Sequence, residues 1–275
     1  MKKHALLLPL LALSSAAMAE DYQLFGSAHY DKMDADSFEQ DVHSLYAKYY
    51  FDKKSTLGPL AELDYINSKS NVFALYSRSE TSNANLSYKD TDYYKVGGEL
   101  FVNNFLIGAS YSYADSGSSD YDNKTYSLGY LINKDLLVKV VASDPENGDT
   151  TYLFSGQYTH RLGGNDYLGV TVSADDEFDY REVTSKYFRS LGEDRYLSAY
   201  VFLSDDENFG SNWYLGGDFY FNRYVSVGVN YSKNDYYSLR AQYFFNSNWS
   251  LSAQYSSNAD ISDYDGYSLN LEGRW

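Results

Sequence analysis

Residues 213–221 read Trp213-Tyr214-Leu215-Gly216-Gly217-Asp218-Phe219-Tyr220-Phe221. The odd-numbered positions of this stretch carry apolar side chains and one glycine, whereas the even-numbered positions carry tyrosine, glycine and aspartate. Successive side chains of a β-strand point to opposite faces, so the alternation predicts a strand with one apolar face and one small or polar face.

The same alternation recurs along most of the chain, between clusters of Asn, Asp, Gly and Ser. Its clearest instances are Leu136-Val138-Val140-Ala142, Leu168-Val170-Val172-Ala174, Leu197-Ala199-Val201-Leu203, Val225-Val227-Val229-Tyr231 and Trp249-Leu251-Ala253-Tyr255. Aromatic residues make up 18% of the composition and 32 residues are Tyr, which argues against both a helical bundle and a disordered chain. We therefore expect a single all-β domain over residues 20–275.

The first nineteen residues have the features of a signal peptide. Lys2 and Lys3 precede an apolar stretch from Ala5 to Leu13, which is too short to span a bilayer, and Ala17-Met18-Ala19 forms a cleavage site. We expect residues 1–19 to be cleaved after export by the Sec route. The whole chain has a net charge of −16, and losing two lysines makes it more acidic, which argues against nucleic-acid binding. Without cysteine, stability cannot come from disulfide bonds.

Two features favour a membrane barrel over a soluble sandwich. Aromatic residues stand at both ends of the apolar rows, as in Tyr237 to Phe245. Membrane barrels carry a belt of aromatic side chains at each of the two membrane interfaces, which matches this placement. The opposite faces, such as Ser250-Ser252-Gln254, suit a wet lumen. The chain therefore predicts a single transmembrane antiparallel up-and-down β-barrel of 16–18 strands, with short periplasmic turns and acidic outer loops.

The stretch from Asn71 to Tyr88 leaves the strand count open, at 18 if it forms two strands and at 16 if it belongs to one long outer loop. If residues Lys69 to Asp92 form a loop and not a hairpin, they are the candidate constriction of the lumen. Pro59 is expected at the start of a strand, where it removes no ladder hydrogen bond.

The chain ends in a run of alternating hydrophobic residues closed by an aromatic one, which comprises Tyr267, Leu269, Leu271, Gly273 and Trp275. It resembles the C-terminal assembly signal of Gram-negative outer-membrane proteins, although Phe is commoner than Trp at its last position. Near the start, Tyr49-Tyr50-Phe51 leads to Gly58-Pro59-Leu60-Ala61-Glu62, and these fifteen or so residues resemble the general bacterial porin family. The resemblance implies passive diffusion of small solutes through a water-filled barrel in the cell outer membrane.

Few residues indicate catalysis or metal binding. His29, His43 and His160 have no serine at the two-residue spacing that would place both side chains on one face of a strand, although a cross-strand His–Asp pair stays open. Three scattered histidines without cysteine do not make a transition-metal site. We therefore expect neither an enzyme nor a cofactor.

Strand parity predicts a set of charged residues that line the pore. They are Lys48, Glu62, Asp64, Lys95, Glu99, Lys139, Arg161, Glu182, Lys186, Asp218, Arg240, Glu272 and Arg274. A barrel of sixteen or more strands is too wide for its own side chains to fill, so these charges would set a field across a wet lumen. The acidic loops predict a mild preference for cations.

A selective channel for sugars or oligosaccharides stays an alternative, because inward tyrosines such as Tyr46, Tyr50, Tyr93, Tyr214 and Tyr220 could stack on sugar rings. An outer-membrane hydrolase is a weaker one. The expected partners are outer-membrane lipid, lipopolysaccharide, the barrel assembly machinery and small hydrophilic solutes. An apolar outer face can contact either lipid or a second subunit, so the sequence leaves open whether the protein forms a homotrimer.

Overall fold

The structure, a computed structural model, describes residues 21–35, 38–83, 90–117, 119–261 and 263–275. The expected signal peptide, residues 1–19, lies outside these residues. In the described part of the chain, no helix has the length and apolar character needed to cross a membrane.

The described residues form sixteen strands and one short 3₁₀ turn, η2 (Lys233–Asp235). The strands are β1 (Asp21–Ala35), β2 (Phe38–Ser55), β3 (Asn71–Asn83), β4 (Thr91–Val102), β5 (Phe105–Asp115), β6 (Asp120–Asn133), β7 (Leu136–Pro145), β8 (Thr151–Gly163), β9 (Asp166–Asp175), β10 (Tyr180–Gly192), β11 (Arg195–Asp206), β12 (Gly210–Tyr220), β13 (Val225–Ser232), β14 (Tyr236–Phe244), β15 (Trp249–Asn258) and β16 (Tyr264–Arg274).

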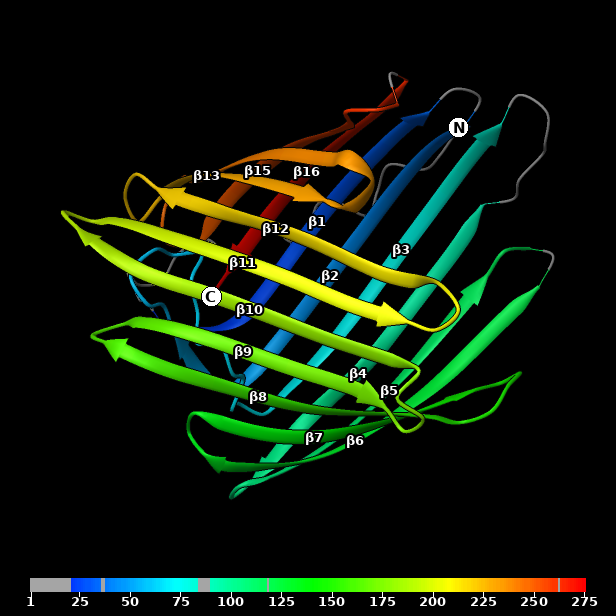
Figure 1. Cartoon of the computed structure of the whole chain (residues 1–275), viewed down its shortest axis with the longest axis horizontal. Helices are drawn as coiled ribbons and strands as arrows, with labels where there is room; N and C mark the ends of the chain where they lie inside the picture. The colour runs from blue at the N-terminus through cyan, green and yellow to red at the C-terminus, as the bar shows by residue number, and fades with distance from the viewer. Residues whose placement is uncertain (1–20, 36–37, 84–89, 118, 262) are drawn as a thin grey trace.

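Each strand pairs antiparallel with its neighbours in the sequence, and β16 pairs with β1, so the sheet closes into one barrel (Figure 1). The predicted all-β barrel is confirmed, and the strand count is sixteen. β3 and β4 pair from Asn71 to Ser79 and from Thr91 to Glu99, so these parts of the 69–92 stretch form a strand pair. Its residues 84–89 lie outside the described residues.

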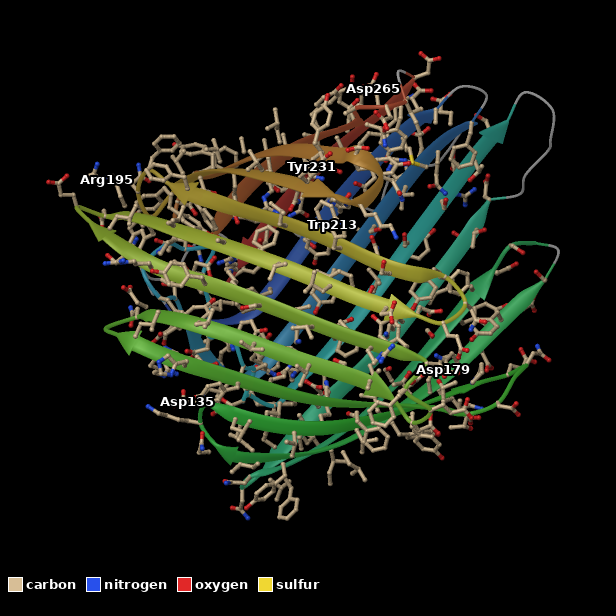
Figure 2. All side chains as sticks on the ribbon, viewed as in Figure 1. Asp135, Asp179, Arg195, Trp213, Tyr231 and Asp265 are labelled. Carbon is tan, nitrogen blue, oxygen red and sulfur yellow. The ribbon has the colours of Figure 1, made fainter. Side chains whose placement is uncertain are left out.

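The two ends of the barrel differ in their connections. One end, which we call the turn end, carries short connections such as 103–104, 134–135 and 193–194, together with the long connection 56–70 between β2 and β3. The other, the loop end, carries connections rich in carboxylates, including 146–150 and 176–179. Asp135 and Arg195 lie at the turn end, whereas Asp179 and Asp265 lie at the loop end (Figure 2).

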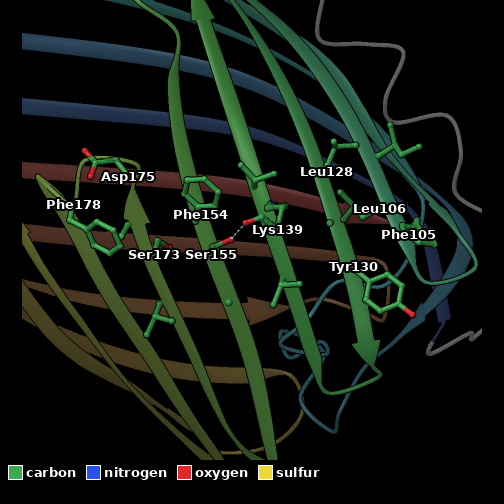
Figure 3. A pocket seen from close by; sticks show the side chains of 17 residues that line it. Phe105, Leu106, Leu128, Tyr130, Lys139, Phe154, Ser155, Ser173, Asp175 and Phe178 are labelled. Carbon is green, nitrogen blue, oxygen red and sulfur yellow. Dashed lines mark hydrogen bonds between the residues drawn. The ribbon is translucent and has the colours of Figure 1, made fainter.

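The outer face of the barrel is apolar and exposed. Leu128 is 60% exposed and Val96 53%, a degree of apolar exposure that a monomer surrounded by water rarely shows. A groove of about 960 Å³ runs over β5 to β9 and is lined mainly by outward side chains such as Phe154 and Val172 (Figure 3). It opens at Gly156, where an added Cβ would meet only a methyl of Val172, 3.8 Å away.

The seam between β1 and β16 is closed by the last residue. The backbone carbonyl of Trp275 accepts hydrogen bonds from the amides of Gln23 and Leu24 at 2.6 and 2.7 Å, and its own amide donates to the Leu24 carbonyl. The rings of Trp275 and Trp249 pack edge to face, with their centroids 5.0 Å apart. The Trp275 ring lies over Gly273, where an added Cβ would collide with it. Tyr267, Leu269 and Leu271 alternate along β16 and are exposed on the outer face.

The strand expected to begin at Pro59 is absent, and this part of the prediction is wrong. Residues 56–70 form turns and bends, with a single isolated bridge between Thr56 and Leu63. Pro59 lies in a turn, because the Glu62 amide donates to the Pro59 carbonyl at 3.1 Å. Residues 61–65 alternate between apolar and polar side chains, as a strand does. Glu62 and Asp64, however, reach Lys186 and Arg161 on the inner wall of the barrel, and the segment pairs with no neighbouring strand beyond the bridge at Leu63.

Candidate functional site: the lumen

Residues 56–70, which we call the lumen segment, cross the inside of the barrel at the turn end. In a ring of sixteen strands, β10 lies opposite β2, and residues 57–66 contact β9 to β12. In Figure 1 the segment is the light-blue trace within the ring of strands. The segment therefore spans the full width of the lumen.

Glu62 anchors the lumen segment to the far wall. Its carboxylate is only 3% exposed and accepts from Lys186 Nζ at 2.7 and 2.8 Å. The hydroxyls of Tyr220 and Tyr167 also donate to it, at 2.5 and 3.5 Å. A buried carboxylate is stable only with such partners, so β9, β10 and β12 together hold this one side chain.

Apolar packing surrounds the Glu62 anchor. Leu57 packs with Tyr167, Phe188 and Tyr220, and Phe188 is fully buried. Gly58 adopts a φ of +143°, and a Cβ there would lie 2.6 Å from the ring of Tyr196, so only glycine fits. At this end, inward side chains form a dry core.

Ile66 extends the core toward the other side of the barrel. It is 4% exposed and packs with Leu106 of β5 and Leu137 of β7. Tyr65 lies over Gly169 of β9, where an added Cβ would meet its ring at 2.5 Å, and its hydroxyl is 2.8 Å from Thr171 Oγ1. The lumen segment thus contacts strands on both sides of its path.

Backbone hydrogen bonds fix the middle of the segment. The Leu60 amide donates to the Arg223 carbonyl at 2.9 Å, and the Leu60 carbonyl accepts from the guanidinium of Arg274. That guanidinium also lies over the rings of Phe25 and Phe244, 5.5 and 5.0 Å from their centroids. Leu60 itself is fully buried.

Four of the predicted pore-lining charges lie on one wall of the barrel, at inward positions of β2, β4 and β7: Lys48, Lys95, Glu99 and Lys139. Lys139 Nζ is 3.7 Å from Glu99 Oε1, whereas Lys48 Nζ lies over the ring of Tyr50, 5.0 Å from its centroid. Three lysines and one glutamate therefore share this wall, and Lys139 lies beside Glu99.

Other predicted charges also have polar partners, most of them of opposite charge. Asp218 pairs with Arg240 across β12, β13 and β14, and Ser198 Oγ donates to Asp218 at 3.1 Å. Arg274 Nε pairs with Glu272 at 2.6 Å. Glu182 accepts from the hydroxyl of Tyr180 at 2.7 Å.

Arg161 and Asp64 meet at the edge of the turn end. Arg161 Nε is 2.9 Å from Asp135 and its Nη2 is 3.9 Å from Asp64. Asp64 and Glu62 thus face inward from the lumen segment and not from a strand. Whether the thirteen residues line a conducting pathway stays a prediction.

Sequence reasoning missed the residues that make the lumen segment cross the barrel: Lys54, Leu57, Leu60, Tyr65 and Ile66. Lys54 is 5% exposed, with its Nζ 3.3 Å from Asn67 Oδ1 and 5.4 Å from the centre of the Tyr50 ring. The Gly58-Pro59 pair was the available signal, because this dipeptide marks turns more often than strands.

Of the three histidines that the sequence singles out, His29 has a carboxylate beside it. His29 Nε2 contacts Asp31 Oδ2 at 2.6 Å on the same strand, and the serine opposite it, Ser44, shares its hydrogen bond with Ser77 Oγ at 2.9 Å. The part of the chain that the structure describes holds no group of three or more His, Asp or Glu arranged for a metal ion.

Comparisons with known proteins agree with this architecture. The chain resembles the outer membrane protein Omp33 of Acinetobacter baumannii, with 18% sequence identity and a TM-score of 0.56, over 93% of this chain and 99% of that one. It also resembles OpdQ of Pseudomonas aeruginosa, with 8% identity and a TM-score of 0.51, over 92% and 98%. A third similar structure is OccK7 (OpdD) of the same organism, with 9% sequence identity and a TM-score of 0.52, over 93% of this chain and 99% of that one. No curated protein matches the chain in sequence.

A family model described as "Putative general bacterial porin" matches residues 1–275, the full sequence. The closed barrel, its apolar exterior and its polar inner wall are the features of an outer-membrane channel. The chain therefore belongs to the general bacterial porin family and is an outer-membrane β-barrel channel protein.

Proposed function

We propose that the protein passes small hydrophilic solutes by passive diffusion through a lumen whose narrowest part is the lumen segment at the turn end. The observation that carries the proposal is the anchoring of Glu62 to Lys186 and Tyr220 on the wall opposite β2, the strand that precedes the segment. A solute must pass beside this anchor, so the segment sets the size limit of the channel.

The rest of the lumen supports transport through water. A sixteen-stranded barrel is too wide for its own wall residues to fill. Toward the loop end the inward positions of β13 and β15 carry Asn230, Ser252 and Gln254, which interact favourably with water. A cavity of about 560 Å³ remains along β10 to β16.

The acidic loop end supports a mild cation preference. Carboxylates in its described connections include Glu146, Asp149, Asp176, Glu177, Asp179, Glu207, Asp260 and Asp263. They raise the local cation concentration over roughly 8 Å at physiological salt, which is the Debye length. Loops with this charge would face the cell exterior and the turn end would face the periplasm.

The mature protein in this proposal comprises residues 20–275, after Sec-dependent export and cleavage of residues 1–19. The strand formed by Tyr267, Leu269, Leu271, Gly273 and Trp275 would be recognised by the barrel assembly machinery. The apolar exterior would contact lipid and lipopolysaccharide, and the proposal requires neither a trimer nor a catalytic step.

Conductance of the refolded mature chain in a planar lipid bilayer tests the proposal. We expect discrete single-channel steps of small amplitude and, under a salt gradient, a reversal potential displaced toward that of the cation. Preference for anions would overturn the charge argument. Absence of steps at every voltage would overturn the channel as a diffusion pathway.

A further inference from the structure

An aromatic and polar niche lies on the lumen wall, away from the lumen segment's apolar core. Its cavity of about 560 Å³ falls within the range of small-molecule sites, roughly 300–1,000 Å³. Strands β10 to β16 form it, and its lining side chains include Tyr200, Tyr214, Asp218, Asn230 and Arg240.

Tyr214 provides a rigid ring platform in the niche. Its ring stacks on Phe202, with centroids 4.9 Å apart and planes 8° from parallel, and Tyr200 approaches edge-on at 6.3 Å. Two neighbours therefore hold Tyr214 in place, yet it remains 38% exposed. Tyr236 and Tyr264 form a second pair on the cavity wall, with centroids 5.0 Å apart.

Glycine shapes the wall on which these rings rest. Gly216 lies at an inward position between Tyr214 and Asp218, and an added Cβ would be 2.7 Å from the Tyr200 ring and 2.6 Å from the Val229 carbonyl. The absence of a side chain lets Tyr200 lie close to the backbone and donate to Asn230 Oδ1 at 2.8 Å. The niche is thus a formed recess and not a gap between mobile side chains.

The charges at the niche are already paired. Arg240 is paired with Asp218, and Lys186, at the edge of the cavity, is paired with Glu62. An ion entering the niche would have to compete with one of these pairs. A neutral solute can instead accept hydrogen bonds from Asn230 Nδ2 and donate to the amide oxygen of Gln254 without disturbing either pair.

We propose that this niche is a weak binding site for a neutral saccharide of one or two rings. A sugar ring combines an apolar face of C–H groups, which can stack on Tyr214, with a rim of hydroxyls, which match the surrounding amides. The proposal rests on the proposed function for access from the loop end, and it names the class of solute that the channel retains.

Maltose is the probe, measured in two ways on the mature protein. In detergent, equilibrium dialysis gives the half-saturating concentration, which we expect in the millimolar range. In the bilayer, maltose should reduce the ion current at similar concentrations, whereas a polyethylene glycol of equal hydrodynamic size should reduce it only through solution viscosity and volume.

Tyr214→Leu should raise the half-saturating concentration about fivefold by removing the ring contact. Asn230→Ala, a second variant that leaves Tyr214 in place, should raise it severalfold. The matched control is Tyr126→Leu on β6, a tyrosine that is 52% exposed on the outer face of the barrel and lies outside the cavity, so it should leave maltose binding unchanged. A variant whose conductance without sugar equals that of the wild type has folded correctly.

The two proposals fail separately. Suppose that the wild type conducts, but its response to maltose does not saturate, equals the response to the polymer, or is unchanged in both Tyr214→Leu and Asn230→Ala. Any of these results overturns the saccharide site and leaves the channel proposal intact. Saturable binding in detergent that both variants weaken, in a protein that shows no conductance, supports the site and overturns the diffusion channel.

Discussion

The lumen of this barrel has two halves that are built from the same strands in different ways. At the turn end, inward side chains such as Phe188 of β10 and Tyr220 of β12 are buried, with only 0% and 4% of their surface exposed. Toward the loop end the same two strands present Glu182 and Tyr214 to the lumen, and Tyr214 is 38% exposed. One half packs as a protein core and the other half as a wetted wall.

The difference teaches that strand alternation specifies which side chains point inward but not what they meet there. Phe188 and Tyr220 are buried because residues 57–66 fill the space in front of them. Tyr214 instead lines the cavity of about 560 Å³ on the lumen wall and is accessible there. The residues that fill the lumen come from another part of the chain. Whether an inward side chain is buried or wet therefore depends on its distance from the lumen segment.

The strongest way to break this contrast is to remove the lumen segment. Replacing residues 57–66 with a short Gly-Ser linker should make both halves wet, and single-channel conductance should rise severalfold because the constriction is gone. A matched control shortens the loop-end connection 259–263, which should leave conductance nearly unchanged. Equal conductance of the wild type and the 57–66 replacement would show that the constriction lies elsewhere.

Phe188→Ala tests the packed half directly. Phe188 is fully buried against Tyr167, Tyr196 and Tyr220, so its truncation should lower the free energy of unfolding by about 3–5 kcal/mol. The comparison variant is Phe202→Ala in the wet half, where the side chain is only half-buried and the loss should be about half as large. Urea unfolding in lipid vesicles measures both, and equal losses would contradict the contrast.

Glu62→Gln tests the anchor between the segment and the wall. The substitution leaves Lys186 without its carboxylate partner. Because Lys186 keeps access to lumen water, the free energy of unfolding should fall by about 2 kcal/mol, which is less than for a fully buried pair. Glu182→Gln on the same strand should cost under about 1 kcal/mol, since Glu182 accepts from Tyr180 at the wetter end. The ratio of the two losses in urea unfolding is the readout.

The smallest effect is expected at the loop end, where Glu207 lies beside Asp179. The Asp179 carboxylate raises the pKa of Glu207 above its ordinary value by hydrogen bonding and charge repulsion, and the Glu207 amide donates to the Asp179 carbonyl at 2.9 Å. A raised pKa in the folded state means that the contact is stabilised at acidic pH and loses this contribution as the pH rises through that pKa.

Hydrogen exchange of the Glu207 amide checks this pH dependence. Corrected for intrinsic rates, protection should be greater at about pH 4 than at about pH 8. Glu207→Gln, which cannot ionise, should remove the difference. Protection that increases with pH in the wild type would show that charge repulsion does not loosen these loops.

The sequence predicted the wall of the barrel in detail because every strand carries its own period-two signal. The inward positions of Lys48, Asp218 and Arg240 follow from parity alone. The lumen segment escaped prediction because residues 61–65 also alternate between apolar and polar side chains, and only contacts with distant strands distinguish a strand from a segment that crosses the interior. Partners such as Lys186 for Glu62 are set by ring closure, which no local pattern encodes.

The anchor at Glu62 also constrains how the molecule matures. Tyr220, its hydrogen-bond partner, follows it by 158 residues, so the segment is synthesised long before the wall it needs. Contacts of such sequence separation form late, after loop closure has brought their ends together. The cylinder must therefore be nearly complete, with β9 to β12 already in register, before its interior can be filled, and a newly inserted barrel should pass through a more open form than the finished one.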